Sequence, residues 1–134
     1  MAEHPNVTLL RRALELVAAG EAEGVLALWA DDMAYFAFDE SGRPGVFHGR
    51  SEFLDMMRTG RQMMREHSYE IIDIRPIGDE LVVAHLRTNA TSSRTGRTVS
   101  GDYLGVYRVQ SGQLVTGCDF VNHETEALME ETWA

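Results

Sequence analysis

The second half of the chain is a series of alternating runs that can form one antiparallel sheet. Four runs, in which apolar and polar residues alternate, cover residues 67–78, 80–92, 97–110 and 113–123. They are separated by the short turn sequences GD, SRTG and SG, and turns of this length join neighbouring antiparallel strands. We therefore predict a β-meander, which needs a second layer to cover one of its faces.

The first half supplies helices for that second layer. Apolar residues recur at spacings of three and four, at Val7, Leu10, Leu14 and Val17. This spacing predicts an amphipathic helix over residues 6–19, with Asn6 as its N-cap and Gly20 as its C-terminal stop. A short second helix is predicted over residues 21–30.

An aromatic segment and a third helix follow. Residues 33–38 read MAYFAF, which predicts a buried strand, and a Gly/Pro loop comes next. A helix capped by Ser51 is expected to turn apolar side chains inward, at Phe53, Leu54, Met56 and Met57. The methionines of this region either fill the core or form a deformable wall for a ligand. The tail, residues 124–134, is expected to be a last helical turn or disordered.

Length and charge limit the class of protein. A chain of 134 residues that is 44% hydrophobic predicts one domain over residues 1–134, and helices followed by a meander predict an α+β fold. The net charge of −9 argues against a nucleic-acid partner. No signal peptide and no apolar stretch of about 18 residues is visible, so we expect a cytoplasmic protein without membrane contact. The lone Cys118 is compatible with a reducing compartment.

Three stretches resemble the nuclear transport factor 2-like superfamily, which includes ketosteroid isomerases, limonene-epoxide hydrolases and SnoaL-like polyketide cyclases. They read LVAAGEAEGVLALWADDMAYF, FHGRSEF and VYRVQSGQLV, in that order. The resemblance implies a cone-shaped fold, in which N-terminal helices pack on a strongly curved, mixed, mainly antiparallel sheet that encloses a pocket. It also implies a small apolar or polycyclic ligand, no cofactor, and a homodimer formed through the outer face of the sheet.

The positions of the isomerases' catalytic acids are altered in this chain. In those enzymes two acids donate hydrogen bonds to a developing enolate, and the corresponding positions hold Ala13 and Gly105 here. Neither side chain can donate, and one lost donor of this kind is often worth about 3–4 kcal/mol. We therefore expect no ketosteroid isomerase activity. The general base of those enzymes corresponds to Asp39, which is either a base at the pocket mouth or a cap of the following loop.

Strand alternation decides which side chains share the pocket, because residues i and i+2 lie on one face of a sheet. The resemblance puts one set of the 80–92 run on the concave side, namely Val83, His85, Arg87 and Asn89. The other set would then face outward, under a second subunit: Val82, Ala84, Leu86 and Thr88. The same register turns inward the residues Tyr103, Tyr107, Gly117, Asp119 and Val121.

The candidate catalytic residues are Asp119, His85 and Asp39. Arg87 and Asp119 are expected to pair, since a buried charge needs a partner. This pair is either structural or functional, and it is reminiscent of two members of the Asp-Arg-Asp arrangement in limonene-epoxide hydrolases. His85 is either a base, because its reference pKa is about 6.5, or a structural residue. The candidate substrate-binding residues are Arg87, Asn89, Tyr103, Tyr35, Tyr107, Val121 and Met57.

Two functions of different class are compatible with these residues. The first is a SnoaL-like enzyme that performs cofactor-independent isomerisation, cyclisation or hydration on a hydrophobic substrate. The second is a non-catalytic module of the same fold that binds a small ligand or a partner protein. A metal site is not expected, because the sequence has no HExxH motif and no spaced His/Cys cluster.

Overall fold

The computed structural model describes residues 2–38, 44–121 and 123–133. Within these residues the elements are α1 (Pro5–Ala18), α2 (Ala22–Leu26), β1 (Trp29–Phe38), β2 (Pro44–His48), α3 (Gly49–Met63), β3 (Met64–Ile77), β4 (Leu81–Ser92), β5 (Thr98–Gln110), β6 (Gln113–Val121) and α4 (His123–Trp133). The strands form a sheet of order β2-β1-β6-β5-β4-β3. Strand β1 pairs parallel with β6 and the other pairs are antiparallel, which confirms the predicted mixed sheet.

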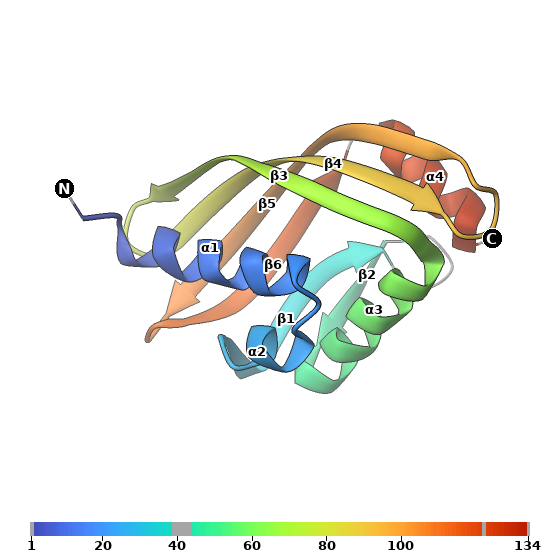
Figure 1. Cartoon of the computed structure of the whole chain (residues 1–134). Coiled ribbons are helices and arrows are strands. Elements are labelled where there is room, and N and C mark those ends of the chain that lie inside the picture. Colours follow the sequence, from blue (N-terminus) through green and yellow to red (C-terminus); the bar gives the residue numbers. More distant parts are fainter. Residues whose placement is uncertain (1, 39–43, 122, 134) are drawn as a thin grey trace.

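The sheet curls strongly around the N-terminal helices (Figure 1). Helix α1 packs against β3 and β4, and α3 packs against β1 and β2. Helix α4 lies at the far end of the sheet, where its Leu128 contacts Met64, Ala90 and Val99. The predicted α+β cone fold is therefore confirmed, and of the two alternatives for the tail, the helix is the one that forms.

The start of α1 differs from the prediction. His4, not Asn6, is the N-cap, since His4 Nδ1 accepts a hydrogen bond from the backbone N of Asn6 at 3.1 Å. Asn6 lies inside the helix, where its Nδ2 donates to the carbonyl oxygen of Asp79 at 2.8 Å. Asn6 thereby ties α1 to the turn between β3 and β4. Gly20 ends the helix as predicted, with a φ of 75° that favours glycine.

Two strands of the first half also differ from the prediction. The second helix stops at Leu26, and β1 already begins at Trp29, which pairs with Leu114 of β6. Residues 44–48, expected to be partly loop, form β2 because they pair along β1. Ser51 does not cap α3, whose N-cap is His48. These strands depend on distant pairing partners, and so local sequence preferences do not reveal them.

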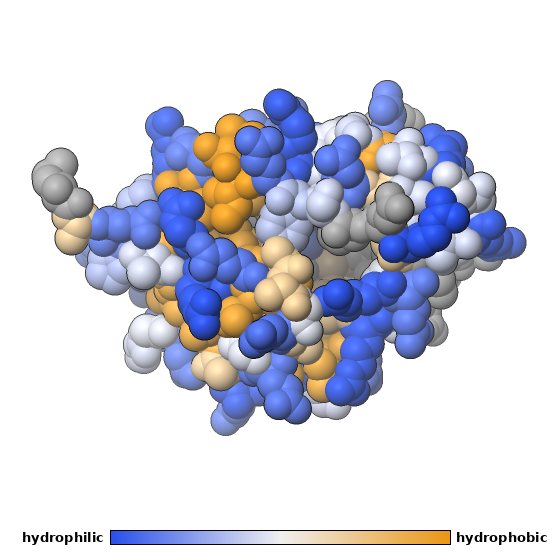
Figure 2. All heavy atoms as spheres, viewed as in Figure 1, coloured by the Kyte–Doolittle hydropathy of each residue, from blue (hydrophilic) through white to orange (hydrophobic). Residues whose placement is uncertain are grey.

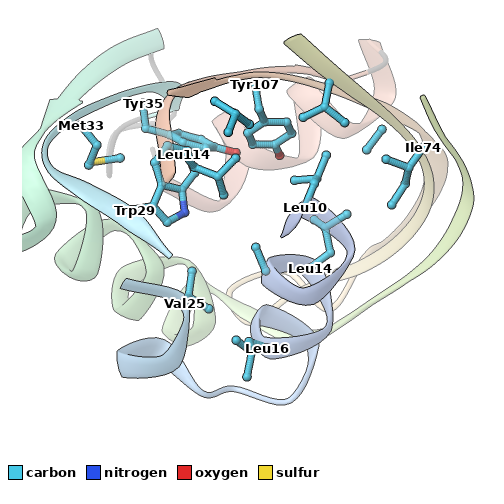
Figure 3. Close-up of a cluster of buried hydrophobic side chains, with 14 of the residues drawn as sticks. Leu10, Leu14, Leu16, Val25, Trp29, Met33, Tyr35, Ile74, Tyr107 and Leu114 are labelled. Atoms are coloured by element: carbon cyan, nitrogen blue, oxygen red, sulfur yellow. The ribbon is translucent and has the colours of Figure 1, made fainter. Parts of the chain in front are cut away.

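Aromatic rings pack between the sheet and the helices. The rings of Trp29, Tyr35, Phe53 and Tyr107 have centroids 5.0–6.3 Å apart, and Figure 3 shows Leu10 and Leu14 of α1 reaching toward the same space. The rings lie close to the backbone because glycines stand beneath them. A Cβ atom on Gly117 would lie 2.8 Å from the ring of Tyr35, and one on Gly105 would lie 2.5 Å from that of Tyr107.

Replacing Gly117 by alanine should therefore lower the free energy of unfolding. The added methyl group overlaps the Tyr35 ring, and overpacking of this kind typically costs about 1–3 kcal/mol. The matched control is Gly60→Ala in α3, where a Cβ atom meets nothing within 4 Å and helix propensity favours alanine by up to about 1 kcal/mol. Urea denaturation measures both changes. Equal stabilities of the two variants would show that the Gly117 site can accept a side chain.

Candidate active site

A cavity of about 800 Å³ lies between the concave face of the sheet and helices α1 and α3. Figure 2 shows a hollow in this side of the molecule, with hydrophilic side chains around it. The volume falls within the range of about 300–1,000 Å³ that is usual for small-molecule sites. Much of the wall is apolar and includes Leu10, Leu14, Trp29, Phe53, Met56 and Leu86.

Three tyrosine hydroxyls and one carboxyl group meet in the wall of this cavity. Tyr35 donates a hydrogen bond to Asp119 Oδ1, and Tyr103 hydrogen-bonds to the same carboxyl group. The hydroxyl oxygens of Tyr35 and Tyr103 are 3.2 Å apart. The hydroxyl of Tyr107 interacts with both of these hydroxyls. We call these four residues the tyrosine–aspartate cluster.

Sheet register brings the cluster together. Tyr35 of β1 stands opposite Gly117 of β6, and Asp119 follows two residues later on the same face. On the other side of β6, Tyr103 of β5 stands opposite Val121, and Tyr107 stands opposite Gly117. Side chains of directly paired residues share a face. Three neighbouring strands therefore deliver the cluster to one place.

Burial controls the protonation of the cluster. Loss of solvent raises the pKa of Asp119 from 3.8 to about 7, although hydrogen bonds from Tyr103 and Tyr35 lower it in part. Burial, followed by the negative charge of Asp119, raises the pKa values of Tyr35 and Tyr103 well above 10. Near neutral pH the carboxyl group therefore exists in both forms, while the tyrosines stay protonated. Such a carboxyl group can accept or release a proton under ordinary conditions.

Several candidates from the sequence lie in the cavity wall. They are Tyr35, Tyr103, Tyr107, Asp119, Val121 and Met57. Sequence reasoning treated the tyrosines as separate contacts and did not recognise them as partners of Asp119. Spacing alone places Tyr103 and Tyr107 on one face of a strand. Nothing local indicates that Tyr35, 84 residues before Asp119, donates to it.

Strand β4 has the opposite orientation from the one predicted. The residues that turn toward the cavity side are Val82, Ala84, Leu86 and Thr88, all of them buried. Leu86 is paired with Tyr103 and Val82 with Tyr107, so these residues share the face of the tyrosines. A slip of one residue moves every side chain of a strand to the other face. The prediction that Val83, His85, Arg87 and Asn89 face the pocket is therefore wrong.

On the outer face these residues have other partners. His85 Nε2 lies 3.3 Å from Asp102 Oδ1, and Arg87 Nε lies 3.5 Å from the same oxygen. Asn89 accepts a hydrogen bond from Ser100. Arg87 thus pairs with Asp102 and not with Asp119, and Asp119 receives its hydrogen bonds from tyrosines. The remaining candidate, Asp39, lies outside the described residues.

The two positions that hold catalytic acids in ketosteroid isomerases supply no donor here. Ala13 lines the cavity, and Gly105 lies against the ring of Tyr107. The hydroxyl groups of this site come instead from β1 and β5. Within the described part of the chain, no group of three His, Cys, Asp or Glu residues could hold a metal ion. Among the helices of these same residues, none has the length and apolar character needed to cross a membrane.

Comparisons with known proteins agree with this architecture. The model of the SnoaL-like domain family matches residues 10–116. An NTF2-like protein of unknown function from Burkholderia pseudomallei is 24% identical, with a TM-score of 0.84 over 96% of this chain and 98% of that one. TerC, co-crystallised with polyporic acid, is 17% identical, with a TM-score of 0.81 over 95% and 98% of the two chains.

A third solved structure is a Mycobacterium tuberculosis protein in complex with estradiol-17β-hemisuccinate. It is 18% identical, with a TM-score of 0.75 over 91% of this chain and 97% of that one. Curated protein sequences include no significant match. The curled sheet and its helices define an NTF2-like cone fold. The chain belongs to the SnoaL-like domain family.

The raised pKa of Asp119 predicts how stability depends on pH. The folded protein holds the Asp119 proton up to about pH 7, whereas the unfolded chain releases it above about 3.8. Between these values the folded state binds more protons, so the contribution of this group to the free energy of unfolding falls as pH rises. Asp119→Asn cannot titrate, and near pH 8 it should be more stable than the wild type by on the order of 4 kcal/mol.

Urea denaturation at about pH 4.5 and about pH 8 tests this expectation. The stability advantage of Asp119→Asn should shrink toward the lower pH, where the carboxyl group of the folded wild type is protonated. Asp102→Asn, which changes an exposed carboxylate on the outer face, is the control and should not reproduce this pattern. An advantage of Asp119→Asn that does not change with pH would mean that Asp119 titrates at an ordinary pKa.

Proposed function

We propose that this protein is a SnoaL-like enzyme that performs cofactor-independent acid–base chemistry on a hydrophobic substrate. The observation that carries the proposal is a carboxyl group with a pKa of about 7, held by tyrosine hydroxyls in a largely apolar cavity. Burying a carboxylate without a cationic partner is costly for stability. A group of this kind in a cleft is a candidate for proton transfer.

Asp119 is the proposed base. Its ionised form removes a proton from a carbon next to a carbonyl group of the substrate, and the protonated form then returns the proton to another atom. That sequence is an isomerisation. If the deprotonated carbon instead attacks a second carbonyl carbon of the same molecule, the oxygen of that carbonyl group takes the proton back from Asp119, and the result is a cyclisation. In a hydration, Asp119 takes a proton from water, the water oxygen bonds to an electrophilic carbon of the substrate, and Asp119 returns the proton to the atom that receives the electron pair of the broken bond.

Tyr35 and Tyr103 are the proposed hydrogen-bond donors. Both stabilise the Asp119 carboxylate while it is ionised. Once Asp119 has taken a proton, it has less need of two donors, and either hydroxyl can turn to the substrate oxygen on which negative charge develops. Hydrogen bonds to such an oxygen are strong in an apolar, water-poor site. Tyr107, Val121 and Met57 would form the wall that holds the apolar part of the substrate.

The comparisons support a small organic ligand for the cavity. Two proteins of the same fold have been crystallised with such molecules, polyporic acid and estradiol-17β-hemisuccinate. The role of Asp39 as a second base stays a prediction, as does the absence of ketosteroid isomerase activity. His85, Arg87 and Asn89 have no part in the proposed chemistry, because they lie on the outer face of the sheet.

Turnover by an Asp119→Asn variant tests the enzymatic proposal. A metabolite library screened by thermal shift first identifies ligands, since a ligand that binds the folded state raises the melting temperature. The variant should keep ligand binding and lose about 10²-fold or more in kcat, the usual contribution of a positioned base. Asp102→Asn should keep full turnover. Undiminished turnover by Asp119→Asn would show that Asp119 is not the base. If ligands bind but the wild type converts none of them, the alternative function, a non-catalytic ligand-binding module, is favoured.

We also propose a homodimer formed through the outer sheet face. The apolar residues that favour it are not the predicted set on β4, which faces the cavity side. Large apolar side chains are exposed on four other strands: Phe36 (43% exposed), Val46 (49%), Leu104 (44%) and Phe120 (57%). Phe36 is paired with Val46, and Leu104 with Phe120. Contiguous apolar surface of this kind is typical of protein interfaces.

Sedimentation of a Phe120→Glu variant tests this surface. The wild type should sediment at about twice the 15.0 kDa mass of one chain, and a charge placed in the apolar face should shift it to the monomer at micromolar concentration. Ile77→Glu makes the same change at an exposed residue of β3, outside the four-residue surface, and should leave the mass unchanged. A monomeric wild type would count against the dimer.

A further inference from the structure

We propose that the ligand of the cavity is an anion whose acidic group is bound by three arginines at the cavity mouth. This inference rests on the proposed function, because it concerns the same ligand. Arg58 and Arg61 in the second half of α3, and Arg65 at the start of β3, line the cavity and are exposed. Exposed side chains that line a cavity stand at its opening. We call these three residues the arginine rim.

The charge of the rim is opposite to that of the whole chain. The chain has 21 acidic and 12 basic residues, yet none of the rim arginines is among the ion pairs of the described residues. Arg58 and Arg61 are three residues apart on one helix, where like charges repel each other, while Asp55 stands three residues before Arg58, where opposite charges attract. Within the described residues, the rim arginines therefore have no ion-pair partner at salt-bridge distance.

Three exposed acidic residues line the same cavity, so the arginines are distinguished by their lack of ion pairs among the described residues and not by an excess of positive charge. Glu52 and Asp55 line the cavity from the first half of α3, and Glu21 lines it from the loop before α2. In the part of the chain that the structure describes, none of the three forms an ion pair with a rim arginine. The guanidinium groups of the rim are therefore free, among the described residues, to pair with an anion that enters the cavity mouth.

The guanidinium group of Arg61 lies beside the end of α1. A Cβ atom on Gly20 would lie 2.3 Å from Arg61 Nη1, so the guanidinium group lies directly against the backbone after the end of α1. The C-terminal end of a helix carries a partial negative charge that favours a cation. The guanidinium group of Arg61 thus stands beside the end of α1, in the wall of the cavity.

The two polar regions of the cavity would orient a ligand. The tyrosine–aspartate cluster would receive the group that gains or loses a proton, and the arginine rim would receive the acidic group. Ionised Asp119 repels a second negative charge, and this repulsion is strong where solvent is sparse. An amphiphilic anion would therefore enter with its apolar body first and keep its acidic group at the mouth. Arginine binds carboxylate and other oxyanions with paired hydrogen bonds.

Two fluorescent probes that differ only in an acidic group test the inference. They are 8-anilinonaphthalene-1-sulfonate and N-phenyl-1-naphthylamine, which lacks the sulfonate. The wild type should bind the sulfonate probe more tightly than the neutral probe. Added salt should lower the affinity for the sulfonate probe and leave the affinity for the neutral probe unchanged. Arg58→Gln, Arg61→Gln and Arg65→Gln should each lower sulfonate affinity about two- to fivefold, the usual effect of an exposed ion pair. None should change the affinity for the neutral probe.

The matched control is Arg12→Gln. It removes the same charge from an exposed residue of α1 that is not part of the cavity wall, and it should leave both affinities unchanged. Equal affinities of the two probes for the wild type would overturn the inference. An equal loss of sulfonate affinity in Arg12→Gln would also overturn it, because the effect would then be one of net charge.

The outcome is separable from that of the proposed function. If the neutral probe binds and the sulfonate probe binds no more tightly, the arginine rim is overturned as an anion site, while the proposal of an acid–base site is unaffected. Failure of both probes to bind would overturn the inference and count against a ligand cavity altogether. Loss of the sulfonate preference in the rim variants, with full preference in Arg12→Gln, would support the rim as a binding site distinct from the proposed base.

Discussion

The parallel pairing of β1 with β6 is the contact on which the site depends. It places Tyr35 opposite Gly117 and therefore beside Asp119, while β5 brings Tyr103 from the other side. Gly117 allows the Tyr35 ring to lie close to the strand, so its hydroxyl reaches the carboxyl group. Without this pairing, Asp119 would lack one of its two donors. A buried carboxylate with so little compensation would be very unfavourable.

The apolar cavity sets the pKa of the Asp119 carboxyl group. The curled sheet and helices α1 and α3 enclose a largely apolar space, and its low polarity raises the pKa of Asp119 to about 7. Two tyrosine hydroxyls limit the rise, and without them burial alone would raise it further. The balance leaves a group that changes its protonation near neutral pH. The same apolar surroundings that raise the pKa of Asp119 therefore also lower the free energy of unfolding when Asp119 is ionised.

Much of the fold could be predicted from the chain itself. The amphipathic spacing in α1 and the four alternating runs depend on neighbouring residues only, and these elements form as expected. The face of β4 was predicted wrongly because the family resemblance, and not the apolar pattern, was used to orient the strand. The set that faces the cavity, Val82, Ala84 and Leu86, is the apolar one, so the alternation itself favoured the observed orientation. Asp119 was predicted as a site residue, but Arg87 was wrongly expected to be its partner.

The amino-acid sequence alone determined the meander, the amphipathic first helix and the placement of Tyr103 and Tyr107 on one face of β5. Periodicity and turn chemistry are local properties, so they can be read along the chain. The tertiary structure alone decided the existence of β2 and the contact of Tyr35 with Asp119. Each of these depends on which distant strands pair and in what register, and a shift of one residue reverses the result.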